Sequence, residues 1–283
     1  MRKSDTGRKG SMIKLGLIGC GAIGSAVVNA ILEEEVPNVR LVGILSLSSN
    51  EVIDRAQRLL GTHFAHTIEE LIELAPDMVV EAAGQPALKA YARSLLAAGI
   101  DVLPMSVGAL ADPDFLADLV QEANRKGGGL LIPSGAIGAL DVLRSGCAAG
   151  EVDELILTST KRPAALRGAP YLIEHGISLE GIQGPVTVFD GPAAQACNAF
   201  PESINIGAAV SLAGLGFERT RIRIVADPNV PRTTHSLRAR GAFGELQLTL
   251  RSSPHPDNPR TSYLACLGAI AAIKNSRGPL RFV

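Results

Sequence analysis

A run of glycines is the first group of residues whose spacing could do chemistry, Gly19-Cys20-Gly21-Ala22-Ile23-Gly24. In such a loop one glycine allows a tight turn, the next lets the backbone approach a phosphate, and the third lets a helix pack closely. Free N–H groups at the start of that helix attract anions. The spacing predicts a dinucleotide pyrophosphate site at Gly19, Gly21, Ala22, Ile23 and Gly24. The alternative is a tight strand–helix turn without a ligand.

His235 is the second candidate. It follows the loop Asp227–Thr234 and leads into a predicted strand. An imidazole with a pKa near 6.5 suits proton transfer at neutral pH, and a nicotinamide enzyme needs such a group when its cofactor takes a hydride. The alternative is a surface histidine on a strand edge. The other histidines lie where solvated side chains are common: His63, His66, His175 and His255.

Asn205 lies in the apolar stretch Ile204–Ala208, and a buried amide needs hydrogen-bond partners. It could cap a helix, or it could bind a carboxamide, and the residues alone favour neither. The turn Ser134–Gly138 contains only small residues around Ile137, so a nicotinamide ring or a substrate could approach its backbone.

The elements that position the glycine run alternate between strand and helix. Thr67–Glu70 has the spacing of a capping box, and Asp112-Pro113 is typical of a helix start. We predict strands at 14–18, 41–45, 78–82, 102–105 and 130–132, and helices at 22–32, 52–60 and 86–98. This alternation predicts an α/β fold, a Rossmann-type doubly wound parallel sheet.

The pattern changes after about Gly150, which predicts a second α/β (α+β) domain. We predict strands at 154–160, 186–189, 221–225 and 245–251, a buried helix at 204–215 and a last helix at 263–274. The predicted organisation is a flexible tail at 1–12, a dinucleotide-binding domain at 13–135, a second domain at 136–256, and a C-terminal helical segment at 257–283 that packs back on the first domain.

Composition narrows the class of partner. The formal net charge of −1 gives no electrostatic case for nucleic acid or an anionic membrane, so we expect a small molecule. No apolar run is long enough to span a membrane, and residues 1–12 do not resemble a secretory signal. The cysteines, Cys20, Cys147, Cys197 and Cys266, have no metal-ligand spacing, so we expect reduced thiols in a cytoplasmic protein without a metal site.

The turn after the second predicted strand bears on cofactor choice. A carboxylate there would bind a ribose 2′-hydroxyl and repel a 2′-phosphate. The segment Leu45–Asn50 has neither a carboxylate nor an arginine. We therefore expect either NAD or NADP to be used.

These motifs together resemble the L-aspartate dehydrogenase family, from about Met12 to the end of the chain. The resemblance lies in the glycine run, His235 with Gly241–Gly244 after it, Asn205-Ile206, and four further segments: Ser106–Leu110, Ser134–Gly138, Ala226–Pro228 and Asn258–Ser262. It implies NAD(P)-dependent oxidation of L-aspartate to iminoaspartate, which hydrolyses to oxaloacetate and ammonia and in some organisms feeds NAD synthesis. It also implies a homodimer assembled through the second domain.

By this resemblance His235 is the catalytic acid/base, and Ala136 and Asn205 match positions that contact NAD. The chain departs from many family members at Ser203 and at Thr233, where they have asparagine. Lys161, Arg162 and Arg232 are candidate cations for the substrate carboxylates, with ordinary surface charges as the alternative. Two other functions remain open: another NAD(P)-dependent amino-acid or semialdehyde dehydrogenase, and a non-catalytic NAD(H)-binding sensor.

Overall fold

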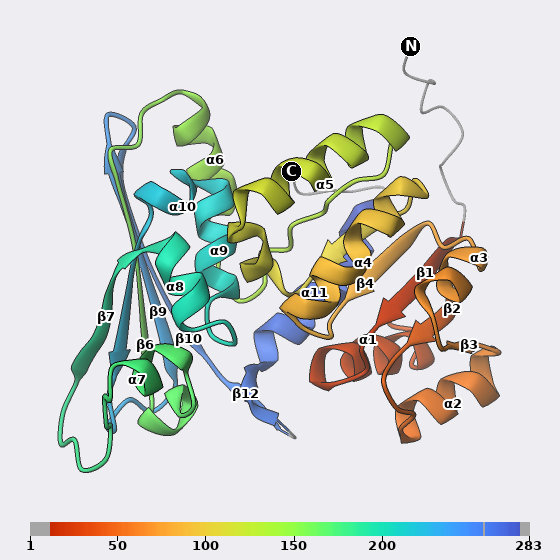
Figure 1. Cartoon of the computed structure of the whole chain (residues 1–283), viewed down its shortest axis with the longest axis horizontal. Helices are drawn as coiled ribbons and strands as arrows, with labels where there is room; N and C mark the ends of the chain where they lie inside the picture. Colours follow the sequence, from red (N-terminus) through yellow and green to blue (C-terminus); the bar gives the residue numbers. More distant parts are fainter. Residues whose placement is uncertain (1–11, 257, 278–283) are drawn as a thin grey trace. The chain divides into compact units, whose positions relative to one another are not determined.

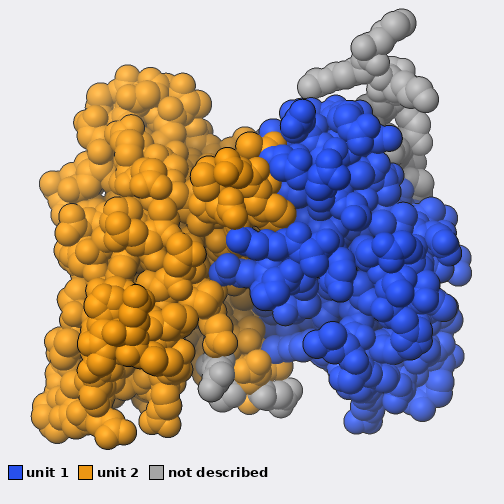
Figure 2. Space-filling model, viewed as in Figure 1, with its two compact units in different colours: residues 1–104, 118–131, 266–283 blue, residues 105–117, 132–265 orange. Residues whose placement is uncertain are grey.

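The computed structural model describes residues 12–256 and 258–277. The predicted tail lies outside the described residues apart from Met12. The chain forms two compact units, coloured separately in Figure 2. The first contains the chain up to Pro104, Asp118–Leu131 and the chain from Cys266 onward, and the second contains Met105–Ala117 and Ile132–Ala265.

A five-stranded parallel sheet forms the first unit, with the strand order β3-β2-β1-β4-β5 (Figure 1). Its strands are β1 Ile13–Ile18, β2 Val39–Leu45, β3 His63–Ala65, β4 Met78–Glu81 and β5 Asp101–Pro104. The strand order reverses direction between β1 and β4, which is the point where open parallel sheets bind ligands beside their carboxyl ends. The predicted Rossmann-type fold is confirmed.

Local sequence signals determine where the helices of this unit begin. Asn50 accepts a hydrogen bond from Ile53 N at the start of α2, and Thr67 accepts one from Glu70 N at the start of α3. Glu70 in turn accepts from His66 N, so both side chains of the predicted capping box bind backbone N–H groups. The helices are α1 Ala22–Leu32, α2 Glu51–Leu60, α3 Ile68–Glu73 and α4 Gln85–Ala97. Helices α5 Pro113–Lys126 and α11 Tyr263–Arg277 each have residues in both units.

Two predictions about this sheet were wrong. No sixth strand forms at Leu130–Ile132, where Leu130 alone makes an isolated bridge to Val102. The three-residue strand β3 is not among the predicted strands, because so short a segment shows no periodicity.

A second five-stranded sheet, mixed in direction, forms most of the other unit, with the order β10-β9-β6-β8-β7. Strands β6 and β8 are parallel and the remaining neighbours are antiparallel. The strands are β6 Glu154–Lys161, β7 Val186–Pro192, β8 Arg221–Ala226, β9 Thr233–Gly241 and β10 Gly244–Ser252. A small pair, β11 Pro254–His255 and β12 Asn258–Ser262, lies apart from it. The predicted second α/β domain is confirmed.

One face of the mixed sheet is buried. Alternate residues of β6, β8 and β9 are buried, and helices of the same unit lie on one side of the sheet in Figure 1. These helices are α6 Leu140–Ala148, α8 Ala193–Ala199, α9 Asn205–Ala213 and α10 Gly216–Arg219. The unit also has α7 Pro170–Glu174 and the 3-10 turns η1 Val107–Ala111 and η2 Pro163–Leu166. On β6 and β9 the buried residues include Leu157, Ser159, His235 and Leu237.

The units and the predicted domains differ in three segments. Residues 105–117 and 132–135, predicted in the first domain, and residues 258–265, predicted in the C-terminal segment, belong by contacts to the second unit. Within 105–117, the turn η1 packs against α8 and α9.

Candidate active site

The glycine loop follows β1 directly, and each glycine has a separate steric reason. Gly19 has φ +84, and a Cβ there would lie 2.8 Å from the backbone of Ala83. A Cβ on Gly24 would lie 2.2 Å from the carbonyl oxygen of Gly19, so the helix packs on the loop itself. A Cβ on Gly21 would meet nothing within 4 Å. Gly19 and Gly24 therefore serve the fold, and the free space lies over Gly21.

The start of α1 fits an anionic ligand. Gly21 precedes the helix, no side chain caps its N–H groups, and its first turn contains no acidic residue. Free N–H groups and the helix dipole favour a phosphate at such an end. The open space at Gly21 is where a pyrophosphate can approach. Gly21, Ala22, Ile23 and Gly24 are therefore the residues that would hold it.

Two side chains that the sequence analysis missed support this loop. Asn50 donates from Nδ2 to the carbonyl oxygen of Cys20 at 2.9 Å while it caps α2, so it links the glycine loop to the turn after β2. Buried Glu81 accepts hydrogen bonds from Ala83 N and Gly84 N, both at 2.8 Å. It shapes the turn after β4 that Gly19 touches. The available signals were an asparagine directly before a helix for Asn50 and a carboxylate at the end of a buried strand for Glu81.

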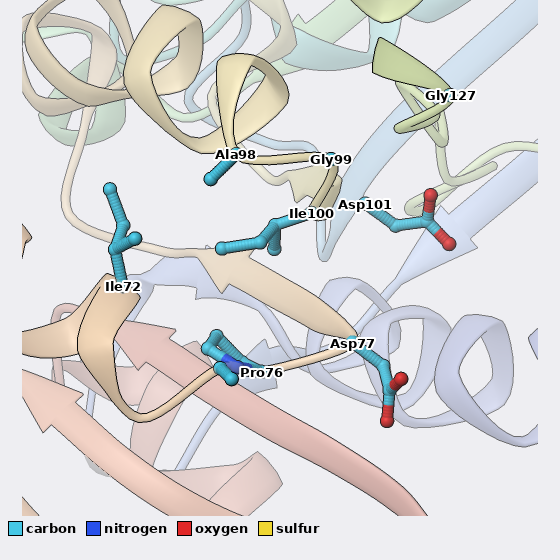
Figure 3. Close-up of a pocket in the computed structure, with 9 residues that line it drawn as sticks. Ile72, Pro76, Asp77, Ala98, Gly99, Ile100, Asp101 and Gly127 are labelled. Carbon is cyan, nitrogen blue, oxygen red and sulfur yellow. The ribbon is translucent and has the colours of Figure 1, made fainter.

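A cavity in the same unit lies elsewhere. It has a volume of about 220 Å³ and is lined by residues that include Pro76, Asp77, Ile100 and Asp101 (Figure 3). These residues precede or begin β4 and β5, whereas the glycine loop follows the carboxyl end of β1. Asp77 accepts from Lys14 N and Asp101 accepts from Gly129 N. We therefore assign the cofactor to the opposite edge of the sheet.

His235 lies on β9 in the second unit, directly opposite Ser159 on β6. The residue is only 3% exposed, and Ser159 Oγ lies 2.9 Å from its Nδ1. The surface-histidine alternative is thus wrong. Because a hydroxyl can donate or accept, Ser159 can hold the ring in either neutral tautomer and in the protonated form.

The other ring nitrogen of His235 is available. Nε2 has no hydrogen-bond partner among the described residues, yet it is not one of their buried unpaired polar atoms. The small exposed fraction of the residue therefore includes Nε2. Burial, and then the charge of Lys161, lower the pKa of His235 to about 3. The imidazole is therefore neutral at neutral pH and can accept a proton at Nε2.

The three candidate cations have different surroundings. Lys161 is half-buried at the end of β6, two residues after Ser159 and on the same face. Arg162 donates from Nε to the carbonyl oxygen of Val230 at 2.9 Å, which ties it to the loop before β9. Arg232 is exposed. Only Lys161 influences the pKa of His235.

Asn205 is the first residue of α9, and Ile204 rather than Asn205 occupies the capping position. Asn205 therefore does not cap its own helix, and the backbone N–H that it binds belongs to the first turn of η1. Asn205 Oδ1 accepts a hydrogen bond from Gly108 N at 3.0 Å, which leaves Nδ2 without a partner among the described residues. Ala136 is 1% exposed, so its neighbours already cover it. The predicted cofactor contacts of Asn205 and Ala136 remain predictions.

The departures from the family pattern lie beside these residues. Ser203 precedes α9 and donates from its backbone to Phe200 O, and Thr233 begins β9 opposite Ser252.

The described residues contain no group of three side chains that could hold a metal ion. Across the same residues, no helix is both long and apolar enough to span a membrane.

A doubly wound sheet with an uncapped helix behind a glycine loop, and a second unit with a buried neutral imidazole, define the class as NAD(P)-dependent oxidoreductases. Comparison with known proteins agrees. Residues 19–133 match the family model "Homoserine dehydrogenase, NAD binding domain", and residues 141–276 match "Aspartate dehydrogenase, C-terminal".

Similarity to individual proteins covers nearly the whole chain. L-aspartate dehydrogenase of Methanosarcina acetivorans is 40% identical over 95% of this chain and 99% of its own length. The Ruegeria pomeroyi L-aspartate dehydrogenase is 37% identical over 96% of both chains. The crystal structure of Thermotoga maritima aspartate dehydrogenase, at 24% identity, shares the fold with a TM-score of 0.73 over 96% of this chain and 99% of that chain. The chain belongs to the L-aspartate dehydrogenase family.

Proposed function

We propose that the protein oxidises L-aspartate with NAD⁺ or NADP⁺, giving iminoaspartate, which water converts to oxaloacetate and ammonia. The observation that supports L-aspartate as the substrate is the 40% identity to a curated L-aspartate dehydrogenase across both units. The buried, neutral His235 supports the same chemistry because the reaction releases a proton. Lys161, which has no partner among the described residues, supports it because the substrate carries two carboxylates.

In this proposal the bound nicotinamide supplies the hydride acceptor. The chain's residues bind, orient and move a proton. The N–H groups at the start of α1 hold the pyrophosphate, and Asn50 and Glu81 keep the loops around it in place. Asn205 Nδ2 is the donor we assign to the carboxamide of the cofactor, with Gly108 fixing its orientation.

His235 handles the proton in this mechanism. As the bond between the α-carbon and nitrogen of aspartate becomes C=N, Nε2 accepts the released proton, directly or through a water molecule. Ser159 keeps the ring in position, because its hydroxyl can accept from Nδ1–H once both nitrogens carry a proton. The protonated ring then returns a proton as water adds to the imine.

A substrate panel tests the proposal. With NAD⁺ and with NADP⁺, we expect L-aspartate to give NAD(P)H, and oxaloacetate with ammonium to consume it. Turnover of another amino acid or a semialdehyde, with none of aspartate, would support the other dehydrogenases. Tight NAD(H) binding without turnover of any compound would support a sensor.

Cofactor choice is tested in the same assay. The turn after β2 contains no carboxylate. The first turn of the following helix contains two, Glu51 and Asp54, and Asp54 accepts a hydrogen bond from Ser49 Oγ at 2.7 Å. We expect kcat/KM for NAD⁺ and NADP⁺ to differ by less than about 100-fold, the range that one or two polar contacts span. A larger preference for either would contradict dual use.

Replacement of Ser159 by alanine tests the orienting role. We expect kcat to fall about 5- to 30-fold, because one buried hydrogen bond that positions the imidazole is lost. The KM for the cofactor should stay unchanged. Ser236→Ala is the matched control, since Ser236 is next to His235 on β9 but contacts Thr249. An S159A variant with normal kcat would remove Ser159 from the mechanism.

The predicted assembly is a homodimer, and the predicted compartment is the cytoplasm. The mixed sheet supports the first, because the face away from α6, α8 and α9 carries no helix of the described chain (Figure 1). The four cysteines are unpaired, which supports a reducing compartment. Light scattering coupled to size exclusion measures the assembly, and a monomeric mass would contradict the dimer.

A further inference from the structure

We propose that Lys161 is the cation that binds a carboxylate of the substrate beside His235. The inference rests on the proposed function, because it assigns one residue to the substrate of that reaction. Three observations carry it: the position of Lys161 on β6, the absence of a counter-ion in the described part of the chain, and its proximity to the imidazole.

The strand β6 directs Lys161 and Ser159 to the same side. Residues two apart on a strand share a face, so Lys161 projects toward the face on which Ser159 contacts His235. Ala226 pairs with Lys161 on β8, and Asp227 N donates to the Lys161 carbonyl oxygen at 2.8 Å. The backbone of Lys161 is thus fixed by its parallel pairing with β8.

The ammonium group of Lys161 has no partner within the described part of the chain. No hydrogen bond or ion pair joins it to another residue there, although the side chain is half-buried. Burial lowers the pKa of Lys161 to about 8, so the group is still charged at neutral pH. A partly desolvated cation without an anion is unfavourable, and a ligand carboxylate would offset that cost.

The other charged groups near Lys161 do not pair with it. Arg162 donates to Val230 O, and Asp227 Oδ1 accepts from Asn229 N rather than from Lys161. His235 on β9 is neutral at neutral pH. No acidic group of the described residues influences the pKa of Lys161. A carboxylate of the substrate can therefore supply the missing counter-ion.

Replacing Lys161 by methionine tests the assignment at neutral pH. Met keeps the length and apolar stem of the side chain and removes the charge. We expect the KM for L-aspartate to rise about 10- to 100-fold, the effect of one charge-assisted hydrogen bond, with unchanged NADH binding. The variant should unfold at the same or a higher temperature, because an unpaired, partly buried charge is gone. Arg251→Met is the control, since Arg251 is exposed on β10 opposite Thr234.

A pH series separates a binding role from a structural one. Oxaloacetate, which lacks an amino group, serves as the probe through its inhibition of aspartate oxidation. For wild type its inhibition constant should stay level below about pH 8 and rise about tenfold per pH unit above it, as the ammonium deprotonates. Lys161→Arg keeps its charge at every pH used, so its inhibition constant should not rise.

The outcomes are distinct. A wild-type protein that does not oxidise L-aspartate would overturn the proposed function and this inference with it. An active wild type with an unchanged KM in K161M would overturn the inference alone, as would an oxaloacetate inhibition constant that is level through pH 9. A raised KM together with the pH response lost in K161R would support it.

Discussion

His235→Asn is expected to lower the kcat for L-aspartate by about 10²- to 10⁴-fold, the range that a general acid–base group contributes. Asparagine can still hydrogen-bond with Ser159, but it cannot accept a proton near neutral pH. The buried imidazole is neutral in the free protein, so its loss removes the proton acceptor without removing a charge. Steady-state kinetics at saturating cofactor measure the effect.

The variant must be shown to fold and to bind cofactor. NADH affinity, followed by fluorescence, should match wild type, because none of the glycine-loop atoms is changed. His175→Asn is the control, as His175 is exposed, contacts Tyr171 and belongs to the same unit. The His175→Asn variant should change kcat by less than about twofold, because substitutions of exposed residues away from the site have small effects. If H235N binds NADH and turns over aspartate at a near-normal rate, His235 is not the acid/base.

Gly21→Ala is expected to weaken NAD(H) binding about 10- to 100-fold with little loss of stability. The space over Gly21 is empty to 4 Å, so a methyl group fits the protein. It would lie where the pyrophosphate must approach and would separate it from the N–H groups of α1. Because Gly21 precedes the helix, alanine there costs at most about 1 kcal/mol of folding free energy.

Gly24→Ala gives the opposite pattern and serves as the matched variant. Its Cβ would meet the Gly19 carbonyl oxygen at 2.2 Å, so the loop or helix must move. We expect a loss of about 1–3 kcal/mol in the free energy of unfolding, as for overpacked cores. Thermal unfolding and cofactor titration on both variants separate the roles. If Gly21→Ala and Gly24→Ala lose the same stability and bind the cofactor with the same affinity, the pyrophosphate site at Gly21 is contradicted.

The first unit could be predicted from sequence because its signals are local. The glycine loop and the Thr67 cap each depend on residues within a few positions of one another, and the helix at 22–32 has its predicted bounds. Where a signal was short or ambiguous the prediction was wrong. Leu130–Ile132 has the apolar character of a strand, but only Leu130 makes a bridge.

The second unit could be predicted only in part, because its site depends on long-range pairing. Ser159 and His235 are separated by 76 residues, and the register between β6 and β9 alone places them opposite each other. The sequence indicated Lys161, Arg162 and Arg232 as candidate cations for the substrate carboxylates without choosing among them. Burial and hydrogen bonding in the structure favour Lys161, because Arg162 binds a backbone carbonyl and Arg232 is exposed.

Transfer of deuterium from substrate to cofactor measures whether aspartate gives its α-hydrogen to the nicotinamide. The protein is given NAD⁺ and L-aspartate deuterated at its α-carbon, and the reduced cofactor is examined by mass spectrometry and NMR. We expect one deuterium at C4 of the nicotinamide and oxaloacetate as the keto product. Reduced cofactor without deuterium, or no reduction of the cofactor by aspartate at all, would contradict the proposed function.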